Sequence, residues 1–435
     1  MRPFRSDSPD GWETAAMLLE TYLKRPRKWE ALIDRLPKKL IAAERKRCQF
    51  LLLGVIRNMS LIDWAIERTV PRNPRPRLKS ILFLSLAEIL LDREGRHRQV
   101  VDAAVERSKA MVSARESGFV NAVLRRAAGL LEEETVRANT LDDAAFRATF
   151  FSHPQWLVER WRQRWGETTA LQLLRWNQAP APVYLRTPSG LPPVTGSDWA
   201  ETRWPGYFRW TGQDWRLVQK ILDGGQGYVA DPSTARPVEL LNPRSGESVL
   251  DLCASPGGKS CAIREKLGRE SGSRLVSVDL PGRRCERLRD NLQRRGGAEV
   301  QVYAGDLLNF TGGDLLESGL PERYSAVLLD APCSNTGVLR RRPDAKWRLH
   351  EVDVPESASL QLSLLLKAAE FTEAGGRLVY ATCSLEAEEN DGVVEGFLKT
   401  AGTRFQLLDA RHYHPITDGH DGGSAFLFSR SLVRI

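Results

Sequence analysis

The sequence contains few residues of the kinds that build metal centres or disulfide frameworks. Its 435 residues include six cysteines and six histidines. The cysteines are scattered without a C-x-x-C pair, and the histidines lack metal-ligand spacing. We therefore expect no zinc knuckle, no other metal site and no disulfide-stabilised secreted domain. The cysteines are Cys48, Cys253, Cys261, Cys285, Cys333 and Cys383.

Long hydrophobic runs are missing as well. No apolar stretch approaches the roughly 20 residues that a membrane-spanning helix needs. The first residues, MRPFRSD, lack the apolar centre of a secretory signal. Hydrophobic residues make up 42% of the chain and charged residues 27%, as in an ordinary globular protein. We expect a cytoplasmic monomer of two or three domains that has no membrane partner.

The net charge of +8 is concentrated in the first third of the chain. Residues 1–150 carry 28 Lys and Arg against 20 Asp and Glu, whereas the remainder is balanced at 35 of each. A basic module attached to a neutral one is typical of a polyanion-binding arm, with nucleic acid as the polyanion. An ordinary solvated basic surface would give the same count, so both interpretations stay open.

The first 140 residues have the pattern of an all-α bundle, because apolar residues recur there at three- and four-residue spacing. A smaller linker domain is expected at 141–226. In it, Ser152 is predicted to cap a helix that has Pro154 in its first turn, and a proline-broken loop precedes a short strand that ends near Thr187. Several tryptophans stand among arginines in this segment and either stack on unpaired bases or pack internally. The predicted helices of the bundle contain residues 15–23, 48–56, 78–91, 100–107 and 119–126.

Residues 227–435 have the pattern of an α/β domain organised around one glycine turn. A buried strand at 249–252 leads into Pro256-Gly257-Gly258, and a helix follows. Such a turn brings backbone N–H groups close to a ligand, and the helix N-terminus favours an anionic group. By itself this motif is equally typical of an ordinary αβ turn.

Acidic residues at the ends of the predicted strands favour the cofactor-loop interpretation. Asp279 ends the next strand, 21 residues after Gly258, close to the offset of about 20 at which a carboxylate meets a ribose hydroxyl. A helix-capping role for Asp279 is the alternative. Strands ending in or just before an acidic residue would place four carboxylates along one sheet edge, where open α/β sheets bind ligands. These are Asp251, Asp279, Asp306 and Asp330.

Two cysteines follow predicted strands. Cys333 stands in Asp330-Ala-Pro-Cys-Ser334, and Cys383 stands in Ala381-Thr-Cys-Ser384. A thiol presented at the ligand edge beside Ser and Thr hydroxyls is typical of a reactive thiolate. One such cysteine is more often a small core residue. Two such cysteines, after strands that we expect to flank the cofactor strand, favour a catalytic role for these thiols.

Together these motifs resemble the RNA cytosine-C5 methyltransferases of the RsmB (Sun/Fmu, NOP/SUN) type. The resemblance rests on 252–259, on the two Cys-Ser motifs, and on Glu389-Asn390 after the second of them. In the helical part, 97–106 and 118–126 resemble the NusB-type RNA-binding domain of bacterial ribosomal members. The segment 152–156 resembles the connection between the two parts. The implied fold is α + α/β and multidomain: a NusB-like bundle (1–140), a linker domain (141–226) and a Rossmann-like class I methyltransferase domain (227–435).

The resemblance implies S-adenosylmethionine as the cofactor and a cytosine of 16S ribosomal RNA, unpaired or flipped out, as the substrate. It assigns nucleophilic addition at cytosine C6 to Cys383 and help in product release to Cys333. Asp279 would bind the ribose, Asp306 would lie near the adenine, and Asp330 would serve both the cofactor and the reacting base. The cofactor loop would comprise Cys253, Ala254, Ser255, Pro256, Gly257, Gly258 and Lys259.

The sequence departs from the family pattern at two positions. Asn335 replaces the usual Gly after Pro-Cys-Ser, and because Asn tolerates left-handed backbone angles we expect the turn to survive. Ala230 stands where Gln is common, which leaves one cofactor-side contact undefined. The basic stretch 340–347 matches a family loop and is predicted either to grip RNA phosphates or to be a solvated loop.

Other functions fit parts of this pattern. The same chemistry on transfer RNA or at another ribosomal site is a near alternative. A DNA cytosine methyltransferase would instead attack with the Pro-Cys thiol, Cys333. A non-catalytic RNA-binding or antitermination factor with a methyltransferase shell is the alternative from a different class, although it would not require both thiols and all four carboxylates.

Overall fold

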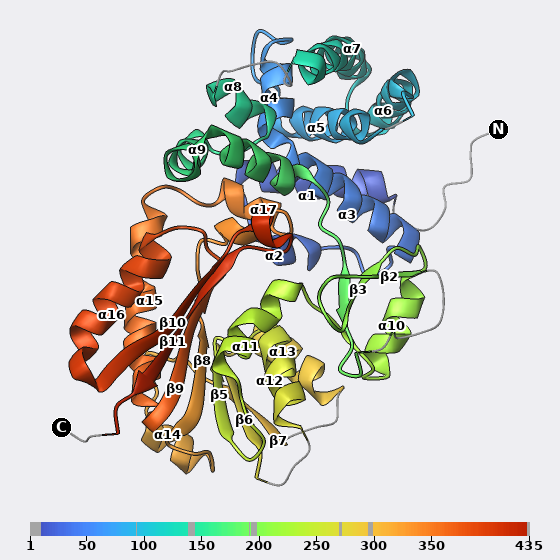
Figure 1. Cartoon of the computed structure of the whole chain (residues 1–435). Coiled ribbons are helices and arrows are strands. Elements are labelled where there is room, and N and C mark those ends of the chain that lie inside the picture. The colour runs from blue at the N-terminus through green and yellow to red at the C-terminus, as the bar shows by residue number, and fades with distance from the viewer. Residues whose placement is uncertain are drawn as a thin grey trace. The chain divides into compact units, whose positions relative to one another are not determined.

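The computed structural model describes residues 10–92, 94–137, 144–190, 192, 198–268, 272–294 and 299–432. The chain forms two compact units (Figure 1). The helical unit comprises Met1–Ala179 together with Leu339–Glu351, and the sheet unit comprises Pro180–Val338 together with Val352–Ile435. Among the described helices none is long and apolar enough by itself to cross a membrane, although the bent pair Ala42–Arg57 and Met59–Glu67 passes that test by length and composition.

The helical unit confirms the predicted bundle. Its core is a continuous set of buried apolar side chains that includes Trp12, Leu52 and Phe83. The Asp10 carboxylate caps the first helix by accepting from the backbone N–H groups of Trp12 and Glu13. The helices are α1 (Gly11–Lys24), α2 (Trp29–Ile33), α3 (Ala42–Arg57), α4 (Met59–Glu67), α5 (Pro76–Leu91), α6 (His97–Met111), α7 (Ala114–Arg137), α8 (Ala144–Phe150) and α9 (Gln155–Gln178).

The predicted helix cap at Ser152 is wrong. Helix α9 begins at Gln155 with Pro154 in the capping position and no side-chain cap. Ser152 instead adopts a left-handed backbone with φ of 49°, and its hydroxyl accepts a hydrogen bond from the backbone N–H of Leu61 at 3.2 Å. The hydroxyl is therefore used to join two helical segments.

The segment 339–351 leaves the sheet unit and packs inside the helical unit. The indole Nε1 of Trp347 donates to the carbonyl of Ile56 at 2.7 Å, and the Lys346 side chain is 1% exposed. Arg340 lies over the ring of Trp176 at 4.3 Å. The predicted phosphate grip is therefore wrong for Lys346, which is buried in the protein. Burial holds the pKa of its ammonium well below the usual range.

The sheet unit is built on seven strands in the order β10-β11-β9-β8-β5-β6-β7. Strands β5 to β9 are parallel, and β10 and β11 add an antiparallel edge. Strand β9 pairs with β8 and not with β5, so the prediction that both cysteine-bearing strands flank the cofactor strand is wrong for β9. The strands are β5 (Ser248–Leu252), β6 (Arg274–Asp279), β7 (Glu299–Ala304), β8 (Tyr324–Asp330), β9 (Thr372–Thr382), β10 (Phe405–Tyr413) and β11 (Gly423–Arg430).

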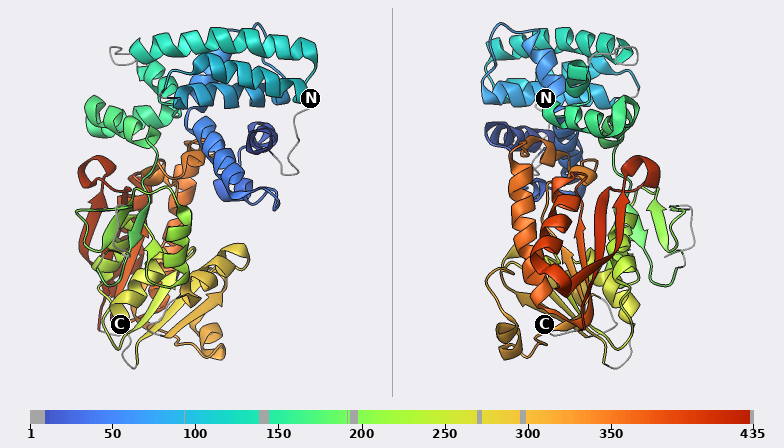
Figure 2. Two further views of the ribbon diagram at one scale, coloured as in Figure 1. Left: turned by 90° about the vertical axis from the view of Figure 1, so that its right-hand side faces the viewer. Right: turned by 60° about the vertical axis from the view of Figure 1, so that its left-hand side comes forward.

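Helices cover both faces of this sheet, as Figures 1 and 2 show. Helices α11 (Arg236–Leu241), α12 (Gly258–Leu267) and α13 (Arg283–Gln293) pack on one face. Helices α15 (Asp353–Glu370) and α16 (Val393–Ala401) pack on the other. The central strands are consequently buried on both sides, which explains their continuous apolar sequences. The short helices α14 (Gly312–Glu317) and α17 (Pro415–Asp418) complete the unit.

A smaller antiparallel sheet of order β2-β3-β1-β4 precedes the large one in the chain. The predicted strand after the proline-broken loop is β1. The rings of Trp199 and Trp210 lie 4.7 Å apart on neighbouring strands, so these two half-buried tryptophans pack against each other. The predicted linker domain 141–226 thus contributes α8 and α9 to the helical unit and this sheet to the sheet unit. Its boundaries stay a prediction. The elements are β1 (Tyr184–Arg186), β2 (Trp199–Glu201), β3 (Tyr207–Trp210), α10 (Trp215–Asp223) and β4 (Tyr228–Val229).

Candidate functional site

The glycine turn between β5 and α12 forms as expected from the sequence. Gly257 has φ of 103° and occupies the capping position of α12. A Cβ at this residue would also lie 2.9 Å from the side chain of Leu288. Both the backbone angle and the close approach require glycine there. Cys253, at the start of the turn, has a left-handed φ of 58°.

Asp279 fastens this turn to the end of β6. Its carboxylate accepts from the backbone N–H of Ser255 at 2.7 Å and from that of Leu280 at 2.9 Å. The Ser255 hydroxyl is buried and has no hydrogen-bond partner among the described residues. A buried polar group of this kind normally has a partner. The turn therefore offers a cradle with a donor or acceptor available to a ligand.

The predicted row of four strand-end carboxylates is only partly correct. Asp251 lies within β5 with 0% exposure, where it accepts from the Ser260 hydroxyl. Burial raises its pKa to about 7, while the Ser260 hydrogen bond acts in the opposite direction. Asp306 is exposed beyond β7 and accepts from the side chain of Asn309 at 2.8 Å. Asp251 is therefore buried within its strand, whereas Asp279, Asp306 and Asp330 lie at the edge of the sheet.

Lys259 and Asp330 form an ion pair across the edge of the sheet. The ammonium of Lys259, on the first turn of α12, lies 2.7 Å from the carboxylate of Asp330 at the end of β8. Burial alone would lower the pKa of Lys259, but the nearby Asp330 carboxylate outweighs it and raises the pKa above its usual value. The sequence placed both residues in the site, but their pairing was not predicted.

The two predicted thiols lie in contact. The sulfur atoms of Cys333, after β8, and Cys383, after β9, are 3.2 Å apart, and both side chains are partly exposed. The hydrogen bond to Cys383 holds the pKa of the Cys333 thiol well above its usual range, and burial adds to the effect. Cys333 therefore keeps its proton, and its S–H can donate to the sulfur of Cys383. The structure brings together the two cysteines that the sequence singled out.

A buried carboxylate, Glu389, joins the two thiol loops. It lies in a short π-helical turn and accepts from the backbone N–H of Ser334 at 2.8 Å and from Nε2 of Gln361 at 2.9 Å. The hydroxyls of Ser334 and Ser384, one on each thiol loop, also donate to it. Asn390 accepts from the Thr382 hydroxyl at 2.7 Å. The sequence marked the Glu-Asn pair only as part of a motif, and this structural role was missed.

Asn335 forms the turn after Cys333. Its φ is 64°, so the expectation that Asn would tolerate a left-handed turn in place of Gly is confirmed. Its Nδ2 donates to the carbonyl of Cys333 at 2.6 Å, and its Oδ1 accepts from the Cys383 thiol at 3.5 Å. Ala230, the other departure, is buried, and its backbone N–H donates to the carbonyl of Tyr184 at 3.1 Å.

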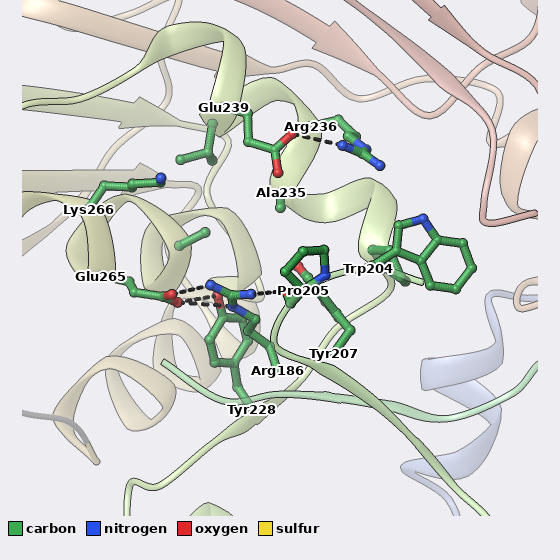
Figure 3. Close-up of a pocket in the computed structure, with 13 residues that line it drawn as sticks. Arg186, Trp204, Pro205, Tyr207, Tyr228, Ala235, Arg236, Glu239, Glu265 and Lys266 are labelled. Atoms are coloured by element: carbon green, nitrogen blue, oxygen red, sulfur yellow. Dashed lines mark hydrogen bonds and ion pairs between the residues drawn. The ribbon is translucent and has the colours of Figure 1, made fainter. Parts of the chain in front are cut away.

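A separate cavity of about 230 Å³ lies between the small sheet and helices α11 and α12. Figure 3 shows Arg186 reaching Glu265 beside the ring of Tyr228. The lining residues of α12 are Ala262, Glu265 and Lys266, whereas the glycine turn precedes the N-terminus of this helix. Neither thiol lines this cavity. This cavity is therefore separate from the reactive groups.

Comparisons with known proteins find ribosomal RNA methyltransferases and a NusB-type domain. Residues 238–419 match the family described as 16S rRNA methyltransferase RsmB/F. Residues 13–129 match the NusB family, and 153–189 match a ferredoxin-like domain of RsmF/B-like methyltransferases. The chain is 31% identical over 409 residues to ribosomal RNA small subunit methyltransferase B of Klebsiella pneumoniae (strain 342), with 88% of each chain covered.

Two solved structures show the same fold. The crystal structure of PH0851 superimposes with a TM-score of 0.75 at 20% identity and covers 97% of this chain and 99% of that one. NSun6 from Pyrococcus horikoshii, solved with SFG, gives a TM-score of 0.53 at 16% identity, with 65% of this chain and 99% of that one covered.

We predict that Asp251→Asn removes a pH-dependent loss of stability. The folded protein keeps a proton on Asp251 up to about pH 7, whereas the unfolded chain releases it near pH 4. The free energy of unfolding of the unmodified protein should therefore fall, relative to the variant, as the pH rises from about 4 to about 7, by at most ~1.4 kcal/mol per pH unit, and then level off. Urea titrations at several pH values measure this difference. Asp290→Asn, at an exposed carboxyl of α13, is the control, and a difference that stays constant with pH would contradict the assignment.

We also predict that Glu389→Gln destabilises the sheet unit. The new NH₂ group would face donors that now point at a carboxylate oxygen, which leaves buried groups unsatisfied at a cost of ~1–3 kcal/mol. Chemical denaturation measures the loss. Glu395→Gln, at an exposed position of α16, should change the stability by less than about 0.5 kcal/mol. Equal effects of the two substitutions would show that the Glu389 network does not hold the loops.

Proposed function

Since the chain belongs to the 16S rRNA methyltransferase RsmB/F family, we propose that it transfers a methyl group from S-adenosylmethionine to C5 of a cytosine in small-subunit ribosomal RNA. The observation that carries the proposal is the contact between the Cys333 and Cys383 sulfurs beside the glycine turn. Two thiols at one sheet edge are unusual for a structural role but suit a reaction that forms and then breaks a carbon–sulfur bond.

The family match confirms the fold expected from the sequence. The NusB match covers most of the helical bundle, and the methyltransferase match covers the large sheet from α11 to α17. The ferredoxin-like match begins in the segment that resembled the connection between them. The chain is therefore a methyltransferase with an N-terminal NusB-like domain.

The residues of the glycine turn fit S-adenosylmethionine. The buried Ser255 hydroxyl has no hydrogen-bond partner among the described residues, and the turn at Gly257, with φ of 103°, packs closely against Leu288. In the proposal, residues 253–259 hold the methionine and ribose portions, Asp279 binds the ribose hydroxyls, and Asp306 lies near the adenine. When bound, this cofactor supplies an electrophilic methyl group on a positively charged sulfur.

Cys383 is the proposed nucleophile. Cytosine C5 is a weak nucleophile in an intact aromatic ring, and addition of a thiolate at C6 converts it into an enamine-like carbon. We assign the bond with C6 to Cys383 because the family pattern gives nucleophilic addition to the second Cys-Ser motif. Cys333, whose pKa is raised by its hydrogen bond to Cys383 and by burial, is then the neighbouring protonated thiol. Asp330, held by Lys259 at 2.7 Å, would hydrogen-bond the N3/N4 edge of the base and favour its protonation during the addition.

Release of the product requires two bonds to break. A base removes the proton from C5, the electron pair re-forms the C5–C6 double bond, and the C6–S bond breaks to give back the Cys383 thiolate. Cys333 keeps its proton 3.2 Å from that sulfur, and its S–H can stabilise the departing thiolate by donating a hydrogen bond to it. This step is the proposed reason for the second thiol.

Ribosomal RNA is the proposed partner. The basic surplus of the first 150 residues lies in the NusB-like domain, as expected for a surface that meets phosphates. The relative from Klebsiella pneumoniae is named for the small-subunit RNA. A thiol can reach C6 only if the base leaves its stack, so we propose an unpaired or flipped cytosine.

We predict different outcomes for the two single alanine substitutions. Cys383→Ala should abolish both the covalent protein–RNA adduct and methylation, with a loss of roughly 10⁴-fold or more in rate. Cys333→Ala should still form the adduct but release it slowly, so the adduct should accumulate. Methyl transfer to small-subunit RNA, denaturing gels and bisulfite sequencing give the three readouts.

Cys48→Ala, in the core of the helical unit, is the matched control and should keep both activities. Loss of the adduct in Cys333→Ala but not in Cys383→Ala would reverse the assignment. Absence of S-adenosylmethionine binding by calorimetry in the unmodified protein would favour a non-catalytic RNA-binding factor.

A further inference from the structure

The amide of Asn335 is fixed in one orientation. Its Nδ2 donates to the carbonyl of Cys333 at 2.6 Å. A carbonyl oxygen can only accept, so the NH₂ group must face it, and a flipped amide would place two oxygens against each other. The amide oxygen is therefore the atom that faces Cys383, with Oδ1 3.5 Å from Sγ.

This orientation determines which thiol donates in each hydrogen bond. An amide oxygen accepts and cannot donate, so Cys383 must donate its S–H to Asn335. The sulfur of Cys383 is then available to accept from Cys333, whose raised pKa keeps its proton in place. The result is a chain of hydrogen bonds that runs from Cys333 through Cys383 to Asn335.

We propose that Asn335 is a positioning residue for Cys383: it holds the S–H of the resting enzyme on the amide oxygen and fixes the direction of the sulfur lone pairs. The inference rests on the proposed function only in giving Cys383 the role of nucleophile. The contacts of Asn335 with Cys333 and Cys383 are present in the folded protein whatever the role of Cys383.

Asn335 is a neutral acceptor among the charged groups that face the thiols, and its effect opposes that of Lys259 and agrees with that of Glu389. The ammonium of Lys259 interacts with Cys383 and favours its thiolate, although the ion pair with Asp330 reduces that effect. Glu389, behind Cys333, disfavours negative charge in the pocket. The amide is neutral, and its acceptor oxygen stabilises the protonated thiol. The resting sulfur is thus protected from oxidation and adventitious alkylation until substrate displaces the S–H from the amide.

The backbone explains why Asn suits this position. A φ of 64° is accessible to Asn, Asp and Gly and strains most other residues. Asn335→Gly therefore keeps the turn and removes only the amide. Asn335→Asp keeps the turn and the shape but replaces the neutral acceptor by a carboxylate.

Alkylation of Cys383 by iodoacetamide, without RNA or cofactor, tests the proposal. Peptide mass spectrometry measures the modification of each cysteine as a function of pH in the full-length protein. Because the thiolate is the reactive form, loss of the acceptor in Asn335→Gly should raise the rate at neutral pH by roughly 2- to 12-fold, the range of one ordinary hydrogen bond, and shift the pH profile to lower pH. Asn335→Asp should slow the reaction and shift the profile to higher pH.

Asn242→Gly is the matched control. Asn242 also has a left-handed backbone, with φ of 50°, but it caps α11 away from the thiols. This control should leave the alkylation of Cys383 unchanged. Unchanged rates and pH profiles in both Asn335 variants, or shifts as large in Asn242→Gly, would overturn the proposal. Because the assay uses no substrate, a failure of the proposed methylation would leave this result standing, and the reverse also holds.

Discussion

The rest of the site depends on one constraint, the 3.2 Å contact between the sulfurs of Cys333 and Cys383. Neighbouring parallel strands provide it, because Asp330 of β8 lies level with Ala381 of β9 and both chains leave the sheet at the same edge. Beyond the sheet the two loops stay together through hydrogen bonds such as that from the Gly337 N–H to the Cys383 carbonyl at 2.9 Å. Glu389 adds a buried anchor by accepting from both serine hydroxyls that follow the cysteines. The register of β8 and β9 brings the two cysteine-bearing loops together, and the buried Glu389 carboxylate holds them in that position.

The chain that carries Cys333 continues directly into the helical unit. After Val338 it passes into the segment 339–351, which is buried against the bundle through Trp347 and Lys346. A buried lysine is costly, and its ammonium here finds the carbonyl of Arg57 at 3.3 Å. The loop that carries Cys333 is therefore continuous with a segment that is held in the helical unit.

Much of this architecture could be predicted from the sequence. Strands β5, β6 and β8 are predominantly apolar, and the turn after β5 is predicted because glycines follow that strand at once. The edge strand β10 was not predicted, because its exposed face is polar and a bulge between Leu407 and Asp409 breaks its alternation. The Glu389 network was missed since its donors come from loops and a helix far apart in the sequence. Strand order was also misjudged: chain order does not reveal that β9 lies beyond β8.

The identity of the attacking sulfur is the central claim, and peptide mapping of a trapped adduct tests it most directly. Ribosomal RNA that carries 5-fluorocytosine cannot lose a proton from C5 after methyl transfer, so the carbon–sulfur bond should persist through proteolysis. Mass spectrometry should find the modified nucleotide on the peptide that contains Cys383. A nucleotide attached to Cys333 instead, or complete turnover of the fluorinated RNA without any covalent product, would contradict it.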